Sequence, residues 1–397
     1  MNLLYSAFIR EDSETKGVLK KVISQCIVFK KEFEDIYLYI SRKDEAVLYK
    51  VEKNGLQEID TFKYNKLSVF DEESRIRKIR GFLRYNSFLN YLNEIINLYK
   101  IDILYLRNSH PTSKLMNILD NKKIIRLLEY PTYPYEEEYK KIQPKLERIL
   151  FWNNKPRKIE DLVDLVVGIS AEKNLNVDEK FILISNGIQL DSMKVKKQNK
   201  KNYLNLLSIA VVSFWHGYDR IIKGLYEYYK TNPEKEIYYH CVGEGSDLEN
   251  LKTLVRELSL EKYVIFHGIK TGEDLDRVVD ECDIAFGSLG NHRKGLYADS
   301  ALKNREYCAR GIPFVIASDD QDFPETFPFV YRIPKDDTPV DINQVVKWYE
   351  SLIKEHPNYS IEMRKYAEEN LSWDAKMRPV IEKIKELARE KERKTNT

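Results

Sequence analysis

The chain has 397 residues, 43% of them hydrophobic and 32% charged, which is the composition of a globular protein long enough for two cores. The formal net charge of +2 argues against a dedicated nucleic-acid binder, because phosphate contacts require a strong basic excess. The four cysteines are scattered and form no CxxC pair, so we expect no metal site and no disulfide framework, but reduced thiols as in a cytosolic protein.

The amino terminus and the longest apolar runs predict the location of the protein. Residues 1–12 contain no long apolar segment after a basic start, so we expect no signal peptide. No apolar run approaches the ~20 residues that a membrane-spanning helix needs. We therefore expect a cytoplasmic protein, and peripheral attachment to the inner face of the cell membrane stays open.

In the first half, short apolar runs alternate with amphipathic stretches. Residues 17–27 carry apolar side chains at helical spacing between the first two runs. Strands are expected at residues 3–9, 36–40, 102–106, 123–128 and 162–169. Alternation of this kind predicts a parallel sheet with helices on both faces, which is an α/β fold.

The second half repeats this pattern after a polar interruption. Residues 191–203 are lysine-rich and lack an apolar period, so we interpret them as a linker. Strands are then expected at residues 204–212, 237–242, 263–267, 284–286 and 313–317, and helices at 248–258 and 302–309. The expected domains are 1–190 and 204–372, each doubly wound, with a ligand in a cleft outside the carboxyl ends of the strands. Residues 373–397 are expected to form a charged helix, and its packing back on the N-terminal domain stays open.

The loop with the clearest chemistry lies within residues 287–317, GSLGNHRKGLYADSALKNREYCARGIPFVIA. It places His292, Arg293, Lys294 and Gly295 between an expected strand and an expected helix. Backbone amides at a helix N-terminus favour anions, and arginine can contact phosphate oxygens through two donors. The loop is therefore a candidate cradle for a diphosphate, and the alternative is an ordinary solvated loop.

Four passages of the chain resemble family 4 retaining glycosyltransferases. They are SNGIQLDSM (185–193), SFWHGYDRIIKGL (213–225), HCVGEGSDLENLKTLVRELSLEKYVIFHG (240–268) and LKNREYCARGIPFV (302–315). In order, they are similar to the family's interdomain NGVD passage, the segment after the first donor-domain strand, the VGxG passage and the LExMAcGxPVV block. The first half resembles the family only in organisation. The resemblance implies the GT-B fold of two facing Rossmann-like domains, with an N-terminal acceptor domain, a C-terminal nucleotide-sugar domain, no metal and a retaining mechanism.

The acidic motif of that family is incomplete in this chain. Glu306 corresponds to the second Glu of the family's Glu-x7-Glu motif, whereas Ala298 stands where the first Glu is expected. An ionised Glu306 can accept hydrogen bonds from both ribose hydroxyls of a donor nucleotide. The alternative for Glu306 is a solvent-exposed acid on a helix.

The usual phosphate cations of the family are also absent. The family's Gly-Arg pair corresponds to Ala210 and Val211, and its following Lys corresponds to His216. Because negative charge develops on the leaving diphosphate, pre-placed cations lower the barrier to transfer. We therefore predict that Arg293 and Lys294 replace the missing cations and act in catalysis.

Two histidines and a glycine complete the predicted donor site. His216 and His292 are predicted to bind the donor, with an ordinary hydrogen-bonded loop histidine as the alternative for His216. Gly295 is predicted to let the backbone approach the phosphates closely.

In the first half, three polar residues follow expected strands. Glu129 ends the strand in RLLEYPTYPYEEEY, at a place where the family commonly has a histidine beside the reacting sugar. We predict that Glu129 contacts the reacting sugar, and the alternative is an ordinary strand-end acid. Arg107 and His110, in LRNSHP, are predicted acceptor contacts; a hydrogen-bonded loop residue is the alternative for His110.

Two charged stretches have less specific interpretations. Residues 75–92 mix five cations with apolar side chains, which is typical either of a helix on an anionic membrane or of a domain helix with a solvated basic face. The acids Asp274, Asp276 and 318–322 have no supporting ligands for a metal, so we interpret them as surface charge.

We expect a metal-independent retaining glycosyltransferase that needs no cofactor and moves a hexose-type sugar from a nucleotide-sugar to a glycan or lipid-linked acceptor, as in bacterial surface-polysaccharide assembly. A nucleotide-sugar epimerase of the same fold is one alternative. A catalytically silent partner subunit that binds sugar nucleotide is another, because Ala298 replaces a motif Glu. No G-x-G-x-x-G follows the first strand of either half, which argues against an NAD dehydrogenase.

Overall fold

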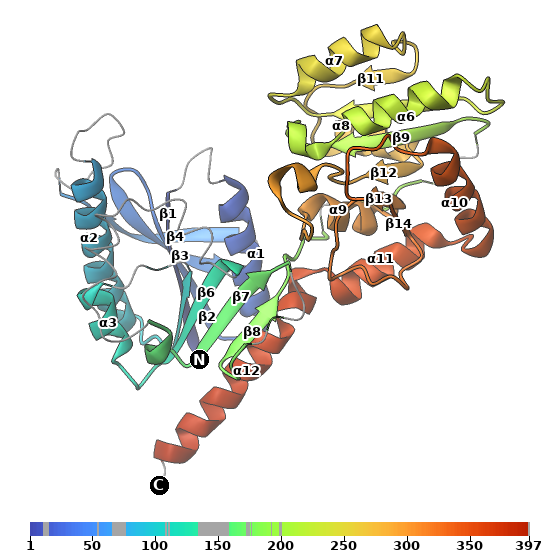
Figure 1. Ribbon diagram of the computed structural model, residues 1–397. Coiled ribbons are helices and arrows are strands. Elements are labelled where there is room, and N and C mark those ends of the chain that lie inside the picture. Colours follow the sequence, from blue (N-terminus) through green and yellow to red (C-terminus); the bar gives the residue numbers. More distant parts are fainter. Residues whose placement is uncertain are drawn as a thin grey trace. The chain divides into compact units, whose positions relative to one another are not determined.

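The computed structural model describes residues 1–10, 16–53, 55–65, 77–107, 109, 112–133, 159–171, 175, 177–191, 193–197 and 201–395. The chain divides into two compact units (Figure 1). Unit 1 comprises Met1–Ile184 and Lys376–Thr397, and unit 2 comprises Ser185–Ala375.

Unit 1 is built on a mixed sheet. Its strands are β1 (Asn2–Arg10), β2 (Asp35–Ser41), β3 (Glu45–Glu52), β4 (Gly55–Lys63), β5 (Ile103–Arg107), β6 (Ile125–Tyr133), β7 (Leu165–Ser170) and β8 (Phe181–Ile184). Its helices are α1 (Lys16–Glu32), α2 (Arg77–Leu98), α3 (Ser113–Leu119), the short η1 (Ile159–Leu162) and most of α12 (Trp373–Thr395). As far as the structure describes it, the sheet has the order β4-β3-β2-β1-β5-β6-β7-β8.

The β3–β4 hairpin departs from the expected parallel sheet. The pairs β2–β3 and β3–β4 are antiparallel, whereas the other pairs of this sheet are parallel. The sequence does carry a hairpin signal, because Asn-Gly at 54–55 follows one apolar run and precedes a second, alternating one. The short link between the two strands leaves no room for a crossover helix, which a parallel pair requires.

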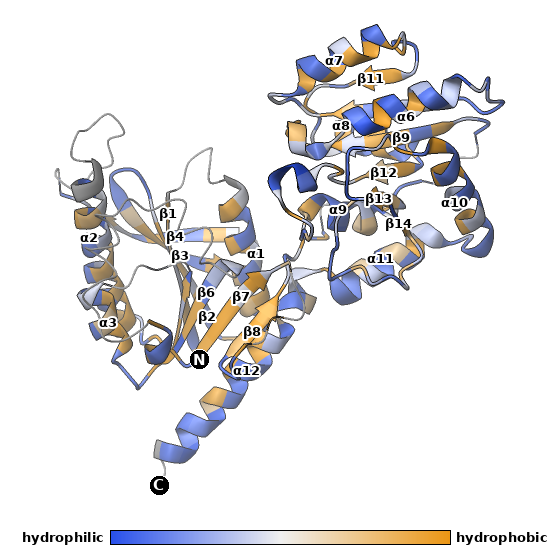
Figure 2. Ribbon diagram, viewed as in Figure 1, coloured by the Kyte–Doolittle hydropathy of each residue, from blue (hydrophilic) through white to orange (hydrophobic). Residues whose placement is uncertain are grey.

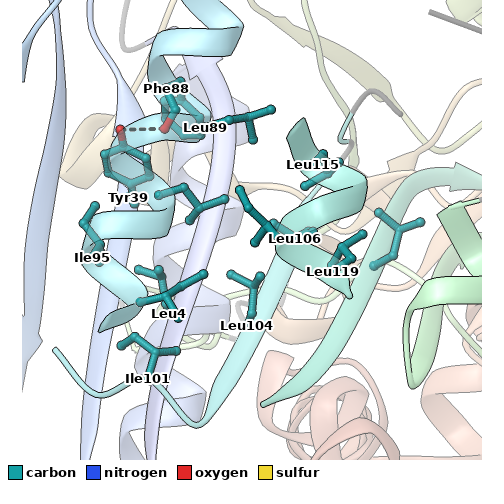
Figure 3. Packing of buried hydrophobic residues seen from close by; sticks show 14 of the residues in the cluster. Leu4, Tyr39, Phe88, Leu89, Ile95, Ile101, Leu104, Leu106, Leu115 and Leu119 are labelled. Atoms are coloured by element: carbon teal, nitrogen blue, oxygen red, sulfur yellow. Dashed lines mark hydrogen bonds between the residues drawn. The ribbon is translucent and has the colours of Figure 1, made fainter. Parts of the chain in front are cut away.

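Successive side chains of these strands pack on opposite faces of the sheet, as the two-residue period of a strand requires. Leu4, Leu104 and Leu106 pack toward α2 and α3 in a single apolar cluster (Figure 3). On the other face, the ring of Tyr105 lies 5.4 Å from that of Phe29 on α1. Helices therefore cover both faces, as the alternation of the sequence predicts.

Unit 2 is built on a parallel sheet in the order β11-β10-β9-β12-β13-β14. Its strands are β9 (Leu204–Ile209), β10 (Ile237–Val242), β11 (Val264–Phe266), β12 (Ile284–Phe286), β13 (Phe314–Ile316) and β14 (Val330–Arg332). Its helices are η2 (Phe214–His216), α6 (Asp219–Tyr229), α7 (Leu248–Glu257), α8 (Gly272–Glu281), η3 (Asn291–Lys294), α9 (Leu302–Arg310), α10 (Ile342–Glu355) and α11 (Tyr359–Asn370).

Two apolar clusters sandwich this sheet. One cluster joins it to α6, α7 and α10, and the other joins it to α8, α9 and α11. Neighbouring residues of one strand divide between them: Leu206 belongs to the first cluster and Leu207 to the second. Figure 2 shows the accompanying pattern, in which α6 and α7 carry both hydrophobic and hydrophilic residues. This doubly wound arrangement places the loops after the strands along one edge of the sheet.

The boundary between the units differs from the expected one. It falls between 184 and 185 rather than at 190, and residues 193–197 of the expected linker belong to unit 2. Lys196 is buried there: its Nζ donates to the carbonyl of Cys282 (2.6 Å), and its backbone amide donates to that of Arg310 (2.8 Å). A lysine can bury its stem while its ammonium finds oxygens, so a lysine-rich segment need not be a solvated linker.

The C-terminal helix α12 starts in unit 2 and continues into unit 1. Within unit 1, Gln25 of α1 approaches Met377 (Nε2 to Sδ, 3.8 Å), and Lys385 forms an ion pair with Glu32 at 2.6 Å. The helix therefore packs on α1.

Candidate functional site

The loops after β9 and β12 pack against each other at one edge of the unit 2 sheet. The amide of Leu289 donates to the carbonyl of His216 (2.8 Å), which joins the β12 loop to η2. Gly217 has a φ of +64°, and a Cβ there would lie 2.7 Å from the backbone nitrogen of Gly290. Both the left-handed conformation and this close approach require glycine. The two loops thus form one compact structure at the carboxyl ends of neighbouring parallel strands.

Two lysines stand beside this structure without an acidic partner. The Nζ of Lys294, the last residue of η3, lies 4.5 Å from the centre of the Trp215 ring. Lys303 lies in the first turn of α9, and its Nζ donates to the Tyr218 hydroxyl at 3.3 Å. Among the residues that the structure describes, neither ammonium has a carboxylate within 4.0 Å. Lys303 is a candidate site residue that sequence reasoning missed, although its position just inside a helix N-terminus is visible in the sequence.

His216 is held as a neutral hydrogen-bond donor. Its Nδ1 accepts from the backbone amide of Ser213 (3.1 Å), so the ring proton belongs on Nε2, and the ring stacks on Tyr218 with centroids 5.4 Å apart. Burial, with the charges of Lys303 and Lys294, lowers the pKa of His216 to about 3. Burial likewise lowers the pKa of Lys303 to about 8; the charge of Lys294 acts in the same direction, whereas the carboxylates of Asp299 and Glu306 act against it. Lys294 and Lys303 therefore lie within electrostatic reach of His216, and the acids Asp299 and Glu306 lie within reach of Lys303.

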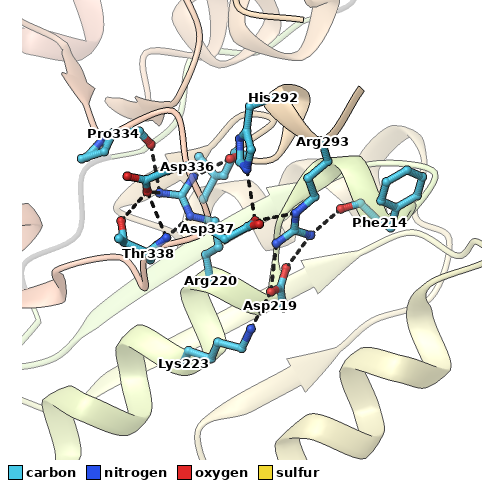
Figure 4. Close-up of polar contacts among 11 residues, drawn as sticks. Phe214, Asp219, Arg220, Lys223, His292, Arg293, Pro334, Asp336, Asp337 and Thr338 are labelled. Carbon is cyan, nitrogen blue, oxygen red and sulfur yellow. Dashed lines mark hydrogen bonds and ion pairs between the residues drawn. The ribbon is translucent and has the colours of Figure 1, made fainter. Parts of the chain in front are cut away.

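Arg293 is engaged differently from its predicted role (Figure 4). Its Nη1 and Nη2 donate to the carboxylate of Asp219 at 2.9 and 3.1 Å, and its Nε donates to Asp337 at 2.7 Å. Nη1 also donates to the carbonyl of Phe214 at 2.7 Å. Two carboxylates therefore neutralise the guanidinium that we predicted to bind a diphosphate. In this geometry Arg293 ties η3 to the start of α6.

Arg220, which follows Asp219 in the sequence, contacts the same loops from the interior of unit 2 (Figure 4). Its side chain is fully buried and donates to the carbonyls of Thr338 (2.7 Å), Pro334 (3.0 Å) and Leu289. Sequence reasoning missed this residue, because an arginine on an amphipathic helix normally predicts an exposed position.

The remaining predicted donor residues lie on η3 and α9. The Nε2 of His292 lies 3.1 Å from Asp337, so this ring faces the same acid as Arg293. Gly295 ends η3 with a φ of +71°, and a Cβ added there would have no described atom within 4 Å. Glycine is thus needed there for its left-handed backbone, and not for close approach of other protein atoms. Glu306 lies one turn after Lys303 on α9 and is partly exposed.

In unit 1, Glu129 lies in a closed polar network. It is fully buried and accepts from Tyr105 (2.6 Å) and Gln25 (2.9 Å), while it forms an ion pair with Arg107. In this arrangement the carboxylate and the guanidinium satisfy each other in the core, and the contacts of Glu129 and Arg107 with sugars stay predictions. The predicted acceptor residue His110 lies outside the described residues.

Of the acids interpreted as surface charge, Asp274 and Asp319 are exposed as expected, whereas Asp276, Asp320 and Asp322 need correction. Asp320 accepts from Nη1 and Nη2 of the buried Arg305, each at 2.9 Å, and Asp322 pairs with the same guanidinium. Asp276 pairs with Arg310 at 2.6 Å. The described residues contain no group of three or more His, Cys, Asp or Glu that could hold a metal ion. Within those residues, every helix is too short or too polar to cross a bilayer.

The match to a known family covers most of unit 2. Residues 191–328 match the family glycosyl transferases group 1. The matched region contains η2, η3 and α9, and therefore His216, Lys294 and Lys303. No curated protein matches the chain in sequence.

Solved structures share the fold over nearly the whole chain. A glycosyltransferase from Rickettsia africae has a TM-score of 0.64 at 14% identity, over 98% of each chain. HepE from Anabaena, in complex with UDP, has a TM-score of 0.59 at 12% identity, over 97% of this chain and 100% of the other. WaaB, a lipopolysaccharide outer core galactosyltransferase, has a TM-score of 0.56 at 12% identity, over 96% of this chain and 99% of the other. The chain has the mixed α/β GT-B fold with two Rossmann-like units, and the family match supports a glycosyl transfer function.

Proposed function

We propose that this protein is a retaining glycosyltransferase that moves a hexose-type sugar from a nucleotide-sugar to a glycan or lipid-linked acceptor. The observation that carries this proposal is the match of residues 191–328 to glycosyl transferases group 1. The complex of Anabaena HepE with UDP, which shares the fold, supports a nucleotide-sugar as donor. The proposal keeps the retaining mechanism implied by the resemblance of the four sequence passages.

In this proposal unit 2 binds the donor and unit 1 binds the acceptor. Glu306 accepts hydrogen bonds from the ribose hydroxyls, and His216 donates from Nε2 to an oxygen of the donor. Positive charge near η3 and α9 stabilises the diphosphate as the glycosidic bond breaks. The reaction proceeds without a metal ion, since protein cations supply this charge.

We further propose that the acceptor belongs to a cell-surface polysaccharide and that the enzyme works at the membrane. The name of WaaB, a lipopolysaccharide outer core galactosyltransferase, supports this class of acceptor. Near the start of α2, Phe82 and Leu83 are each 36% exposed, as a helix that rests on a lipid surface would need.

The test is a panel of nucleotide-sugars incubated with the protein and EDTA, with and without a mixture of bacterial glycolipids as acceptors. We expect one donor to stabilise the protein against heat and to be consumed faster when acceptor is present. NMR of the product should show the anomeric configuration of the donor. Conversion of the donor without any acceptor into an isomeric sugar nucleotide would instead establish the epimerase alternative. Binding without turnover under all conditions would favour the silent subunit.

A further inference from the structure

We propose that Lys303, rather than Arg293, is the cation that binds the diphosphate of the donor. This assignment rests on the proposed function, because it names the residue that holds the donor's charged group. It differs from the prediction made from sequence, which placed the charge on the η3 pair Arg293 and Lys294. It also differs from the resembling family, whose cations follow the first donor-domain strand, where this chain has Val211 and His216.

The cations around η2 and η3 differ in how they are paired. Arg293 is held by two carboxylates, and Arg220 donates to three backbone carbonyls deep in the unit. Lys303 is partly buried, yet its ammonium contacts only the Tyr218 hydroxyl, at 3.3 Å, among the polar groups of the described residues. A lysine that is withdrawn from water is normally paired with an acid. An anionic ligand would supply the missing partner.

Two further kinds of hydrogen-bond donor lie near Lys303. His216 and Lys303 both contact Tyr218, the imidazole by stacking on its ring and the ammonium by bonding its hydroxyl. The imidazole presents Nε2–H, because Nδ1 is occupied by the amide of Ser213. Lys303 also lies in the first turn of α9, whose N-cap residue, Ala301, provides no side-chain hydrogen bond. Ammonium, imidazole N–H and a helix N-terminus together suit a phosphate group.

Like charges also crowd this part of unit 2. The charges of Lys303 and Lys294 both lower the pKa of His216. Lys294 also lowers the pKa of Lys303, whereas the carboxylates of Asp299 and Glu306 raise it. The two acids offset part of the repulsion among these cations, and a bound anion would reduce it further. Lys294 is exposed and lies over Trp215, so it contributes to the field from the rim. Lys303 is the more enclosed of the two, which is where an ion pair is strongest.

The experiment is calorimetric titration of the wild type and three variants with nucleosides, nucleoside monophosphates and nucleoside diphosphates of the common bases. Lys303→Met removes the charge and keeps the stem, and Lys303→Arg keeps the charge. Lys252→Met is the matched control, because Lys252 lies on α7, its side chain is 38% exposed and it pairs with Glu249. We expect Lys303→Met to weaken the preferred diphosphate about 10- to 100-fold, as for loss of a hydrogen bond to a charged group. The corresponding nucleoside should bind with unchanged affinity, and Lys303→Arg and Lys252→Met should keep the preference for diphosphate over nucleoside.

The outcomes separate this assignment from the proposed function. Wild-type affinity of Lys303→Met for the diphosphate would overturn the assignment while the proposed function stands. Equal weakening of nucleoside and diphosphate would also overturn it, because that pattern reports structural damage. If the wild type itself binds none of the nucleoside diphosphates, the proposed function fails, and the assignment fails with it.

Discussion

Arg293 and Asp219 form a two-pronged ion pair, with Nη1 and Nη2 of the guanidinium 2.9 and 3.1 Å from the two carboxylate oxygens. The pair is largely shielded, since the two side chains are 18% and 19% exposed. It joins the loop after β12 to the helix after β9. Although burial alone would raise the pKa of Asp219, hydrogen bonds from Arg293 and Lys223 lower it below its usual range. The pair thus contributes to the shape of the candidate site rather than to its free charge.

A double-mutant cycle tests this role. We expect Arg293→Ala to lower the free energy of unfolding by about 1–3 kcal/mol, because Asp219 then loses two charge-assisted hydrogen bonds. Asp219→Ala should cost a similar amount, and the double variant should cost less than the sum of the two. Urea denaturation measures all three.

The exposed pair Arg277–Asp274 on α8 is the control, and its cycle should show no measurable coupling. Additive effects of Arg293→Ala and Asp219→Ala would contradict the structural role. In that case the catalytic role that the sequence predicts for Arg293 would be the better explanation of its position.

The loop after β12 shows how much of the site could be predicted from the sequence. The sequence located a cationic loop between a strand and a helix, and η3 and α9 lie where it was expected. It could not reveal that Arg293 is neutralised, because Asp219 and Asp337 lie 74 and 44 residues away in the chain. Periodicity reports which face of an element is apolar, but not which distant acid meets a given base.

The partners of Glu129 are also distant in the sequence. Because Glu129 is buried among them, we expect its substitution to lower stability strongly. Glu129→Gln should lower the free energy of unfolding by about 3–5 kcal/mol, because it leaves the Arg107 guanidinium buried without a counter-charge. Adding Arg107→Met should recover part of this loss. Denaturant titration measures the effect.

Glu58→Gln is the control, because Glu58 pairs with Arg42 and is 42% exposed, so its removal should change stability little. A stable Glu129→Gln protein with much reduced turnover would instead restore the predicted contact with the reacting sugar. In the sequence, strand-end position alone could not distinguish these roles, since the partners come from other elements: Tyr105 and Arg107 from β5, and Gln25 from α1.

The low pKa of His216 in the folded protein predicts that the protein loses stability as the pH falls. Its pKa is about 3 in the folded protein and about 6.5 in an unfolded chain, so the unfolded state binds more protons between these values. The free energy of unfolding should therefore fall as pH drops below 6.5, by up to about 1.4 kcal/mol per pH unit from this residue. His216→Asn keeps an acceptor for the Ser213 amide and should show a shallower decline.

Urea denaturation at a series of pH values measures the difference between the two proteins. Parallel curves for the wild type and His216→Asn would show that His216 is not held neutral in the folded state.

The side chains of α2 differ in whether they could reach a membrane. Arg84, one of the cations expected on a solvated basic face, is buried and donates from Nη2 to Ser41 at 2.7 Å. It therefore cannot contact lipid, whereas Phe82 and Leu83 are exposed beside it. Insertion of these two side chains should add apolar binding to any attraction between anionic lipid and the basic residues of 75–80.

Sedimentation with lipid vesicles tests attachment through α2. We expect the protein to sediment with phosphatidylglycerol-containing vesicles at low salt and to be released as salt rises, because salt screens the attraction between charges. Replacing both Phe82 and Leu83 by Ser should weaken this binding, whereas Leu98→Ser, at the exposed end of the same helix, should not. Equal sedimentation with pure phosphatidylcholine vesicles, or none with either, would leave α2 as an ordinary domain helix.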